Sequence, residues 1–149
     1  MKKYFYILFI FLYSCTNNFQ LQEGDLLFQD LDSSPLCDAI ELVTPGYNGS
    51  NFSHIGFIIL DYEKLKVLEA IPPRVMLTEI DDFLSRSNDK EGNPKVIVGR
   101  LKDEYKNTIP KAVKFAYKKI GVDYDEIFIL DNDQYYCSEL LYEAFSKDS

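Results

Sequence analysis

The chain contains a single histidine, His54, and the sequence around it suggests proton-transfer chemistry. Imidazole is the side chain whose pKa suits both the removal and the return of a proton near neutral pH. Such a base can activate a thiol, and Cys137 stands where a polar loop gives way to a helical pattern. The positive end of a helix dipole favours the thiolate form of a cysteine placed there. His54 and Cys137 are therefore the candidate base and nucleophile.

A third group must orient the imidazole, and a predicted β-hairpin offers Glu69. The apolar segment 54–60 opens with His54 and is expected to pair with the segment 66–71. If the turn is centred on residues 62 and 63, Glu69 is the diagonal neighbour of His54 on the same face of the sheet. A shift of one residue in the register would place Glu69 on the opposite face. The pairing therefore supports Glu69 as the orienting carboxylate without proving it.

Each of these residues also has a purely structural interpretation. Buried cysteines are mostly inert packing residues, and Cys137 could instead form a disulfide with Cys37 in an oxidising compartment. The spacing favours a catalytic Cys137 and a buried Cys37. A histidine at the start of a strand is usually exposed or hydrogen bonded, and Glu69 could pair with a lysine such as Lys66. Spacing alone leaves these alternatives open.

The elements that position these residues are typical of an α+β fold, with a small, mostly antiparallel sheet or half-barrel flanked by helices. The segment 54–60 is apolar almost throughout, so we expect it at the centre of the sheet. The predicted strands are 24–28, 54–60, 66–71, 74–78 and 95–101. The predicted helices begin at Pro35 after Ser33 and Ser34, cover 81–86, run from a Thr108 cap to Ile120 with Gly121 as the stop, and begin again at Cys137.

Composition limits the classes of function. With 149 residues, 46% of them apolar, the chain suits one globular domain with a core of its own. A net charge of −8 argues against a nucleic-acid partner, because phosphate binding needs clustered Lys and Arg. One histidine cannot supply a multi-histidine metal site. We therefore expect neither a metal nor a cofactor.

The N-terminus has the composition of an export signal. Lys2 and Lys3 precede an apolar run over 4–13, which is short for a membrane span and typical of a secretory signal peptide. The residues before Cys15 resemble a bacterial lipobox, in which cleavage leaves the cysteine as a lipidated first residue. The alternative is an uncleaved signal anchor.

This pattern predicts a signal peptide over 1–14, a lipidated Cys15 with a polar tether over 15–23, and one domain over 24–149. A lipid on Cys15 would anchor the protein in the cell envelope. We expect it to face the periplasm, because no acidic run follows Cys15. The membrane is thus an expected partner through the anchor.

Several motifs occur together in an order that resembles a known family. They are Gly24 to Phe28, Ser53-His54-Ile55-Gly56, Val67 to Ala70, Gly121 to Asp125 with Phe128, and Tyr135 to Leu140. This order resembles the circularly permuted, NlpC-type branch of papain-like cysteine hydrolases, often called YiiX/YebB-like. The resemblance implies a small antiparallel sheet with the cysteine helix packed across it.

The resemblance also implies roles for individual residues. Cys137 would be the nucleophile, His54 the general acid and base, and Glu69 the orienting residue. The backbone N–H of Cys137 is a candidate oxyanion donor. Tyr135 and Tyr136 are positional candidates for a further oxyanion or substrate contact.

The expected activity is hydrolysis of an amide bond, in a cell-wall peptide or a related small peptide, through a thioester. A lipid-directed thioesterase, phospholipase or acyltransferase on the same fold is the alternative enzyme. A lipoprotein binding module that keeps the fold without the activity is the alternative that is not an enzyme. Because the sequence stops at Ser149, where relatives often continue, we expect a reduced C-terminal wall of the cleft.

Overall fold

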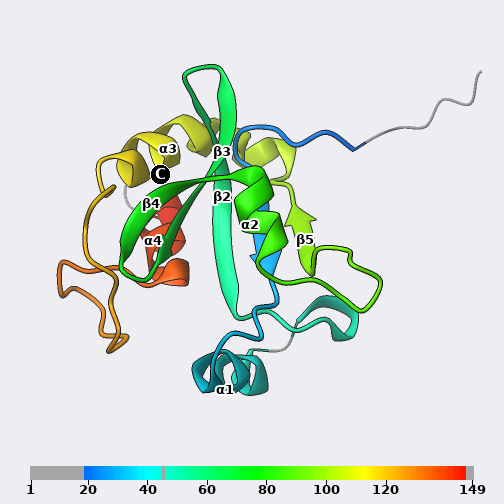
Figure 1. Ribbon diagram of the computed structural model, residues 1–149. Helices are drawn as coiled ribbons and strands as arrows, with labels where there is room; N and C mark the ends of the chain where they lie inside the picture. Colours follow the sequence, from blue (N-terminus) through cyan, green and yellow to red (C-terminus); the bar gives the residue numbers. More distant parts are fainter. Residues whose placement is uncertain (1–18, 45, 147–149) are drawn as a thin grey trace, which may run out of the picture.

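The computed structural model describes residues 19–44 and 46–146, so the expected signal peptide and Cys15 lie outside the described residues (Figure 1). The strands are β1 (Leu26–Gln29), β2 (His54–Asp61), β3 (Lys64–Ile71), β4 (Arg74–Glu79) and β5 (Val96–Gly99). The helices are α1 (Pro35–Val43), α2 (Ile80–Ser85), α3 (Ile109–Tyr117) and α4 (Cys137–Ser146), with 3₁₀ helices η1 (Tyr47–Gly49) and η2 (Asp103–Thr108).

The strands form one sheet in the order β4-β3-β2-β1-β5, and every neighbouring pair is antiparallel. β2 is the central strand, as its nearly continuous apolar sequence predicts. Helix α4 packs on β2 and β3 and α3 packs against α4, whereas α2 packs on β3 and β4 (Figure 1). The α+β class with an antiparallel sheet is therefore confirmed.

The β2–β3 hairpin has the predicted register. Its ladder begins with Phe57 opposite Leu68 and closes at a turn formed by Tyr62 and Glu63. Both turn residues have left-handed backbone angles, with φ of 44° and 66°. Two such residues make a type I′ turn, whose twist matches that of the flanking strands. This turn fixes which side chains of β3 share a face with which side chains of β2.

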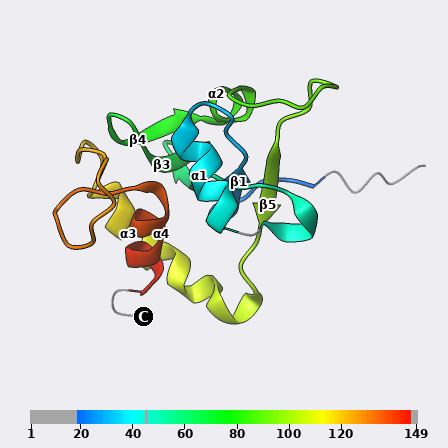
Figure 2. The same cartoon turned by 90° about the horizontal axis from the view of Figure 1, so that it is seen from below.

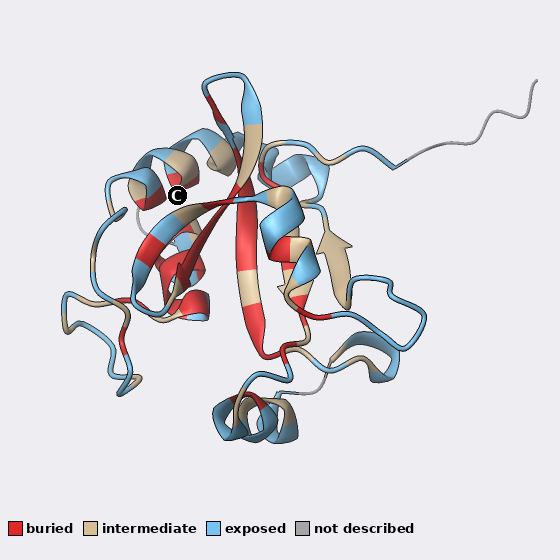
Figure 3. Cartoon of the chain, in the orientation of Figure 1, coloured by how far each residue is buried: buried red, intermediate tan, exposed pale blue. Residues whose placement is uncertain are grey.

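Each face of the sheet buries its own apolar cluster, and the buried residues concentrate along the central strands (Figure 3). The cluster under α3 and α4 contains Phe57, Ile59, Leu68, Ala70, Val75, Ala112, Ala116, Tyr135, Leu140, Leu141 and Ala144. The cluster under α2 contains Leu27, Ile58, Val67 and Phe83. Alternation along β2 and β3 separates the two clusters, since successive side chains of a strand point to opposite faces.

The predicted start of the third helix is confirmed, and its predicted end is wrong. Thr108 is the N-cap residue of α3, but its side chain makes no capping hydrogen bond, because its hydroxyl donates instead to the carbonyl of Tyr105 in η2 at 2.6 Å. The α-helix ends at Tyr117, and a series of turns leads to Gly121, whose φ of 91° ends the segment. Within the described ranges, no helix has the length and apolar character needed to cross a membrane.

Candidate active site

His54 and Glu69 contact each other across the β2–β3 hairpin. Nε2 of His54 lies 2.6 Å from Oε2 of Glu69. The histidine is 6% exposed and the glutamate fully buried, so little water competes with this hydrogen bond. The diagonal, same-face placement predicted from the turn is confirmed. Lys66 instead pairs with Asp61 and Glu79, so the alternative pairing of Glu69 with Lys66 is wrong.

Cys137 is the first residue of α4, where its thiol faces the imidazole of His54. Burial by itself would raise the pKa of the thiol, but the hydrogen bond and charge interaction with His54, together with backbone donors, lower it. Backbone N–H groups of Ile55 and Ser138 also donate to the sulfur and favour the thiolate. Cys137 and Cys37 are both free thiols, so the predicted alternative of a disulfide between them is wrong.

The other two groups have shifted pKa values that match an ion-pair arrangement. Burial alone would lower the pKa of His54, but its contacts with Cys137 and Glu69 raise the pKa to about 9. For Glu69, burial would raise the pKa, yet hydrogen bonds from His54 and Arg86 lower it to about 2. Near neutral pH these directions favour a thiolate, an imidazolium and a carboxylate in a row. This is the protonation state that a thiol hydrolase needs.

The thiol is accessible from a cavity of about 170 Å³ that also contains the imidazole. The cavity is lined by Phe28, Ile40, Thr44, Phe52, Ser53, His54, Ile55, Cys137 and Ser138. Most of this lining is apolar, and part of it comes from α1, which lies across the end of the sheet near α4 (Figure 2). Cys137 is therefore buried but not closed off from a substrate.

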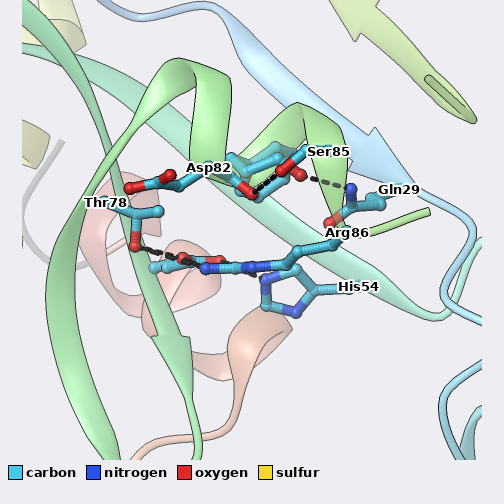
Figure 4. Close-up of polar contacts among 8 residues, drawn as sticks. Gln29, His54, Thr78, Asp82, Ser85 and Arg86 are labelled. Carbon is cyan, nitrogen blue, oxygen red and sulfur yellow. Dashed lines mark hydrogen bonds and ion pairs between the residues drawn. The ribbon is translucent and has the colours of Figure 1, made fainter. Parts of the chain in front are cut away.

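Two residues that the sequence pattern did not single out hold the carboxylate of Glu69. Arg86 donates to both of its oxygens, with Nη1–Oε2 at 2.7 Å and Nη2–Oε1 at 2.6 Å. Thr78 donates its hydroxyl to Oε1. Thr78 lies opposite Val67 in the β3–β4 pair, so alternation of side chains along the strands could have predicted that it lies beside Glu69. No such sequence rule predicts the contact with Arg86. Figure 4 shows Thr78, Arg86 and His54 converging on one point.

The two tyrosines expected near the site lie in different surroundings. Tyr135 is buried in the core, and its hydroxyl donates to Glu143 at 3.0 Å. The hydroxyl of Tyr135 is thus engaged by Glu143 of α4, whereas the expected role was an oxyanion or substrate contact. Tyr136 is half-buried and packs on Phe128, with ring centroids 5.1 Å apart.

One acidic group among the described residues is compact enough to be considered as a metal site. Carboxylate oxygens of Asp30, Asp32 and Glu41 lie within 4.8 Å of one another. Lys95 already occupies this group, with its Nζ 2.9 Å from Asp30 and 2.5 Å from Asp32. Because an internal cation already neutralises two of the three carboxylates, the group is a poor fit for a metal ion.

Residues 20–149 match the family described as permuted papain-like amidase enzymes, the YaeF/YiiX or C92 family. The chain belongs to this family. The members of this family are described as permuted papain-like amidases, and a thiol at a helix start facing an imidazole agrees with the papain-like class.

Relatives of known sequence and structure agree with this membership. The chain is 27% identical over 126 residues to the uncharacterized protein YiiX of Escherichia coli (strain K12), covering 85% of this chain and 58% of that protein. A crystal structure of YiiX from Escherichia coli O157:H7 matches with a TM-score of 0.67 and 28% identity, covering 85% of this chain and 66% of that chain. The chain thus spans less than two thirds of either relative.

The solved C92 relative is described as a metalloprotein. The expectation that no metal is involved therefore conflicts with what is known of a family member. In this chain, the carboxylates of Asp30, Asp32 and Glu41 are the close acidic group within the described ranges, and Lys95 competes for them.

Proposed function

We propose that the protein is a cysteine amidase that cleaves a peptide-type amide bond through Cys137, His54 and Glu69. The observation that carries this proposal is the position of His54, which interacts with the thiol on one side and with the buried carboxylate of Glu69 on the other. Nε2 is taken by Glu69, which leaves Nδ1 as the ring nitrogen that serves the sulfur.

The first half of the reaction forms a thioester. The thiolate of Cys137 attacks the amide carbonyl, and the carbonyl π electrons move onto oxygen to give a tetrahedral oxyanion. Collapse of this species breaks the C–N bond. The imidazolium of His54 gives its proton to the departing nitrogen, so a neutral amine leaves and the acyl group stays on sulfur.

The second half of the reaction releases the acid. Neutral His54 takes a proton from water as the water oxygen attacks the thioester carbonyl. The C–S bond then breaks, and the carboxylic acid departs. The thiolate of Cys137 and the imidazolium of His54 are restored, so no external oxidant or reductant is required.

The start of α4 can stabilise the oxyanion. The N–H groups in the first turn of a helix have no intrahelical partner, and the helix dipole adds partial positive charge there. The backbone N–H of Cys137 is one of these groups, and it belongs to the residue that carries the attacking sulfur. Loss of one such donor typically costs a factor of about 10² to 10³ in rate.

The substrate we propose is a small peptide, including peptides derived from the cell wall. Purified protein should be incubated with murein peptides and the products identified by mass spectrometry, beside a Cys137→Ser sample. New amine and carboxylate ends in the wild-type sample alone would support the proposal. Intact peptides after long incubation with a reactive Cys137 would count against this substrate class.

A lipid-directed acyl hydrolase is the second candidate, and the apolar lining of the cavity beside the thiol favours it. Phe28, Ile40 and Phe52 could contact the first carbons of an acyl chain. The same incubation with phosphatidylethanolamine vesicles separates the two enzymes, because lysophospholipid would appear instead of peptide fragments. If neither substrate is turned over and Cys137 is unreactive, a binding module without activity is left.

We also propose that the chain is a lipoprotein anchored at Cys15 in the cell envelope and facing the periplasm. The cationic start, the short apolar run and the cysteine that follows support this proposal. Metabolic labelling with a palmitate analogue should mark the wild type and not Cys15→Ala. Equal labelling of both proteins would exclude Cys15 as the acylated residue.

A further inference from the structure

The carboxylate of Glu69 is saturated with hydrogen bonds. Oε2 accepts from Nε2 of His54 at 2.6 Å and from Arg86, while Oε1 accepts from Arg86 and Thr78. The side chain of Glu69 has no exposed surface. A carboxylate removed from water needs such partners, because an unpaired buried charge is costly. Here two of the four bonds come from a single guanidinium.

Arg86 is held in place by packing as well as by charge. It follows the last residue of α2, and its guanidinium carbon lies 5.3 Å from the ring centre of Phe83. The ring of Phe83 in turn lies 5.8 Å from that of His54. The carbonyl of Phe83 accepts a 2.7 Å hydrogen bond from Gln29, which fastens α2 to β1. Figure 4 shows Arg86 extending from this helix past His54.

We propose that Arg86 is a positioning residue of the active site, which fixes the carboxylate of Glu69 and keeps it ionised so that it can orient and charge-balance His54. This inference deepens the proposed function and rests on it. Arg86 does not contact the reacting atoms. It acts through Glu69, and its bidentate contact allows the carboxylate one orientation.

Two opposing electrostatic effects follow from this position. The guanidinium opposes protonation of Glu69, in line with the low pKa of that residue, about 2. It also neutralises part of the negative charge of Glu69, which limits how far Glu69 raises the pKa of His54. The imidazolium of His54 can therefore still give up its proton. The charged or titratable groups of this centre are Arg86, Glu69, His54 and Cys137, and the hydroxyl of Thr78 is a further donor. The phenols of Tyr124 and Tyr136 also interact electrostatically with the thiol of Cys137.

The test measures the rate of iodoacetamide alkylation of Cys137 against pH, read by mass spectrometry on the peptide that contains it. A Cys37→Ser background removes the second thiol of the domain. In Arg86→Met, Glu69 becomes protonated at higher pH, and the imidazolium then loses its counter-charge. The acid-side midpoint of the profile should therefore rise by about one pH unit, and the rate below that midpoint should fall about tenfold.

Two further variants keep the test decisive if Arg86→Met folds poorly. Arg86→Lys retains the charge, so its midpoint should stay nearer to that of the wild type. Thr78→Val removes one donor to Oε1 at nearly constant volume, so its midpoint should move upward by less than in Arg86→Met. A midpoint below the wild-type value in either variant would contradict the proposal.

Arg100 provides a matched control for loss of a buried ion pair. Its guanidinium donates hydrogen bonds of 2.7 and 2.8 Å to the buried carboxylate of Asp25, which directly precedes β1. Neither bond involves Cys137, His54 or Glu69. Arg100→Met should lower stability without moving the alkylation midpoint. If Arg86→Met is folded and keeps the wild-type midpoint, Arg86 is merely structural and the proposal is wrong.

Failure of the amidase proposal would be recognised separately. Alkylation of Cys137 needs no substrate, so the effect of Arg86 can be read even if no amide is cleaved. A wild-type thiol that reacts at low pH, together with intact murein peptides, would reject the substrate class and leave the role of Arg86 measurable.

Discussion

Gly56 and Val67 approach each other so closely that position 56 has no room for a side chain. A Cβ atom at Gly56 would lie 3.3 Å from the Cβ of Glu69 and 2.6 Å from Cγ1 of Val67. Gly56 follows His54 by two residues, so the bare backbone there lets the hairpin close beside the His54–Glu69 contact.

Gly56→Ala should therefore disturb both the hairpin and the site. Val67 is fully buried and β3 is held on both sides, so the added methyl group must displace packed atoms. Overpacking of this kind typically costs about 1–3 kcal/mol of stability. Urea unfolding monitored by circular dichroism gives the change, and an unchanged midpoint would contradict the tight approach.

Replacement of the nucleophile should abolish turnover. In Cys137→Ser, a hydroxyl of much higher pKa replaces the thiol beside His54, and the rate should fall by about 10⁴ or more. Cys37→Ser is the matched control, because that thiol contacts Ser33 and Ser34 and has no role in the proposed mechanism. The measurement is the rate of product formation from murein peptides. An equal loss of rate in both variants would contradict the assignment of Cys137 as the sole thiol of the mechanism.

Glu69→Gln should leave reduced but measurable activity. The amide has nearly the same shape, but it cannot stabilise an imidazolium and leaves Arg86 without a charged partner. Loss of an orienting carboxylate costs a factor of about 10⁴ in a comparable triad, so a fall of about 10² to 10⁴ is expected. Thermal unfolding measured in parallel separates this effect from loss of folded protein. Wild-type turnover in a folded variant would remove Glu69 from the mechanism.

The stability of the fold should fall in acid because of Glu69. Its pKa is about 2 in the folded protein against an ordinary value of 4.5, so its contribution is full above 4.5 and is lost as the pH falls toward 2. Unfolding free energies measured across this range should decline less steeply in Glu69→Gln than in the wild type. Parallel curves for the two proteins would show that Glu69 is not ion-paired.

Above neutral pH, His54 and Cys137 should have opposing effects. The pKa of His54 is raised to about 9, so its contribution is full below 6.5 and is lost as the pH rises through 9. The lowered pKa of Cys137 acts in the opposite direction. We expect a shallow net dependence in the wild type and a steeper decline of stability above pH 6.5 in Cys137→Ala if the imidazole keeps part of its raised pKa through Glu69. Urea titrations at pH 6.5, 8 and 9 provide the comparison, and identical slopes would argue against the ion pair.

Much of the site was accessible from the sequence because it depends on local rules. Two adjacent apolar strands and a turn at residues 62 and 63 set the register that brings His54 to Glu69. A 3.6-residue period placed Cys137 at the start of α4. These patterns involve neighbours in the chain or across one hairpin, where parity alone determines the face on which a side chain lies.

Other features depend on contacts between distant segments. Arg86 reaches Glu69 from 17 positions away, and Tyr135 turns to Glu143 although it lies two residues before the thiol. The C-terminal end of α3 was also not predicted, because the α-helix ends at Tyr117 and turns lead on to Gly121. By itself, the sequence determined the hairpin, the helix start and the residue types of the site. Only the tertiary structure decided which cation balances the buried carboxylate and that Cys37 and Cys137 are both free thiols, because these outcomes depend on packing between elements and not on periodicity within one.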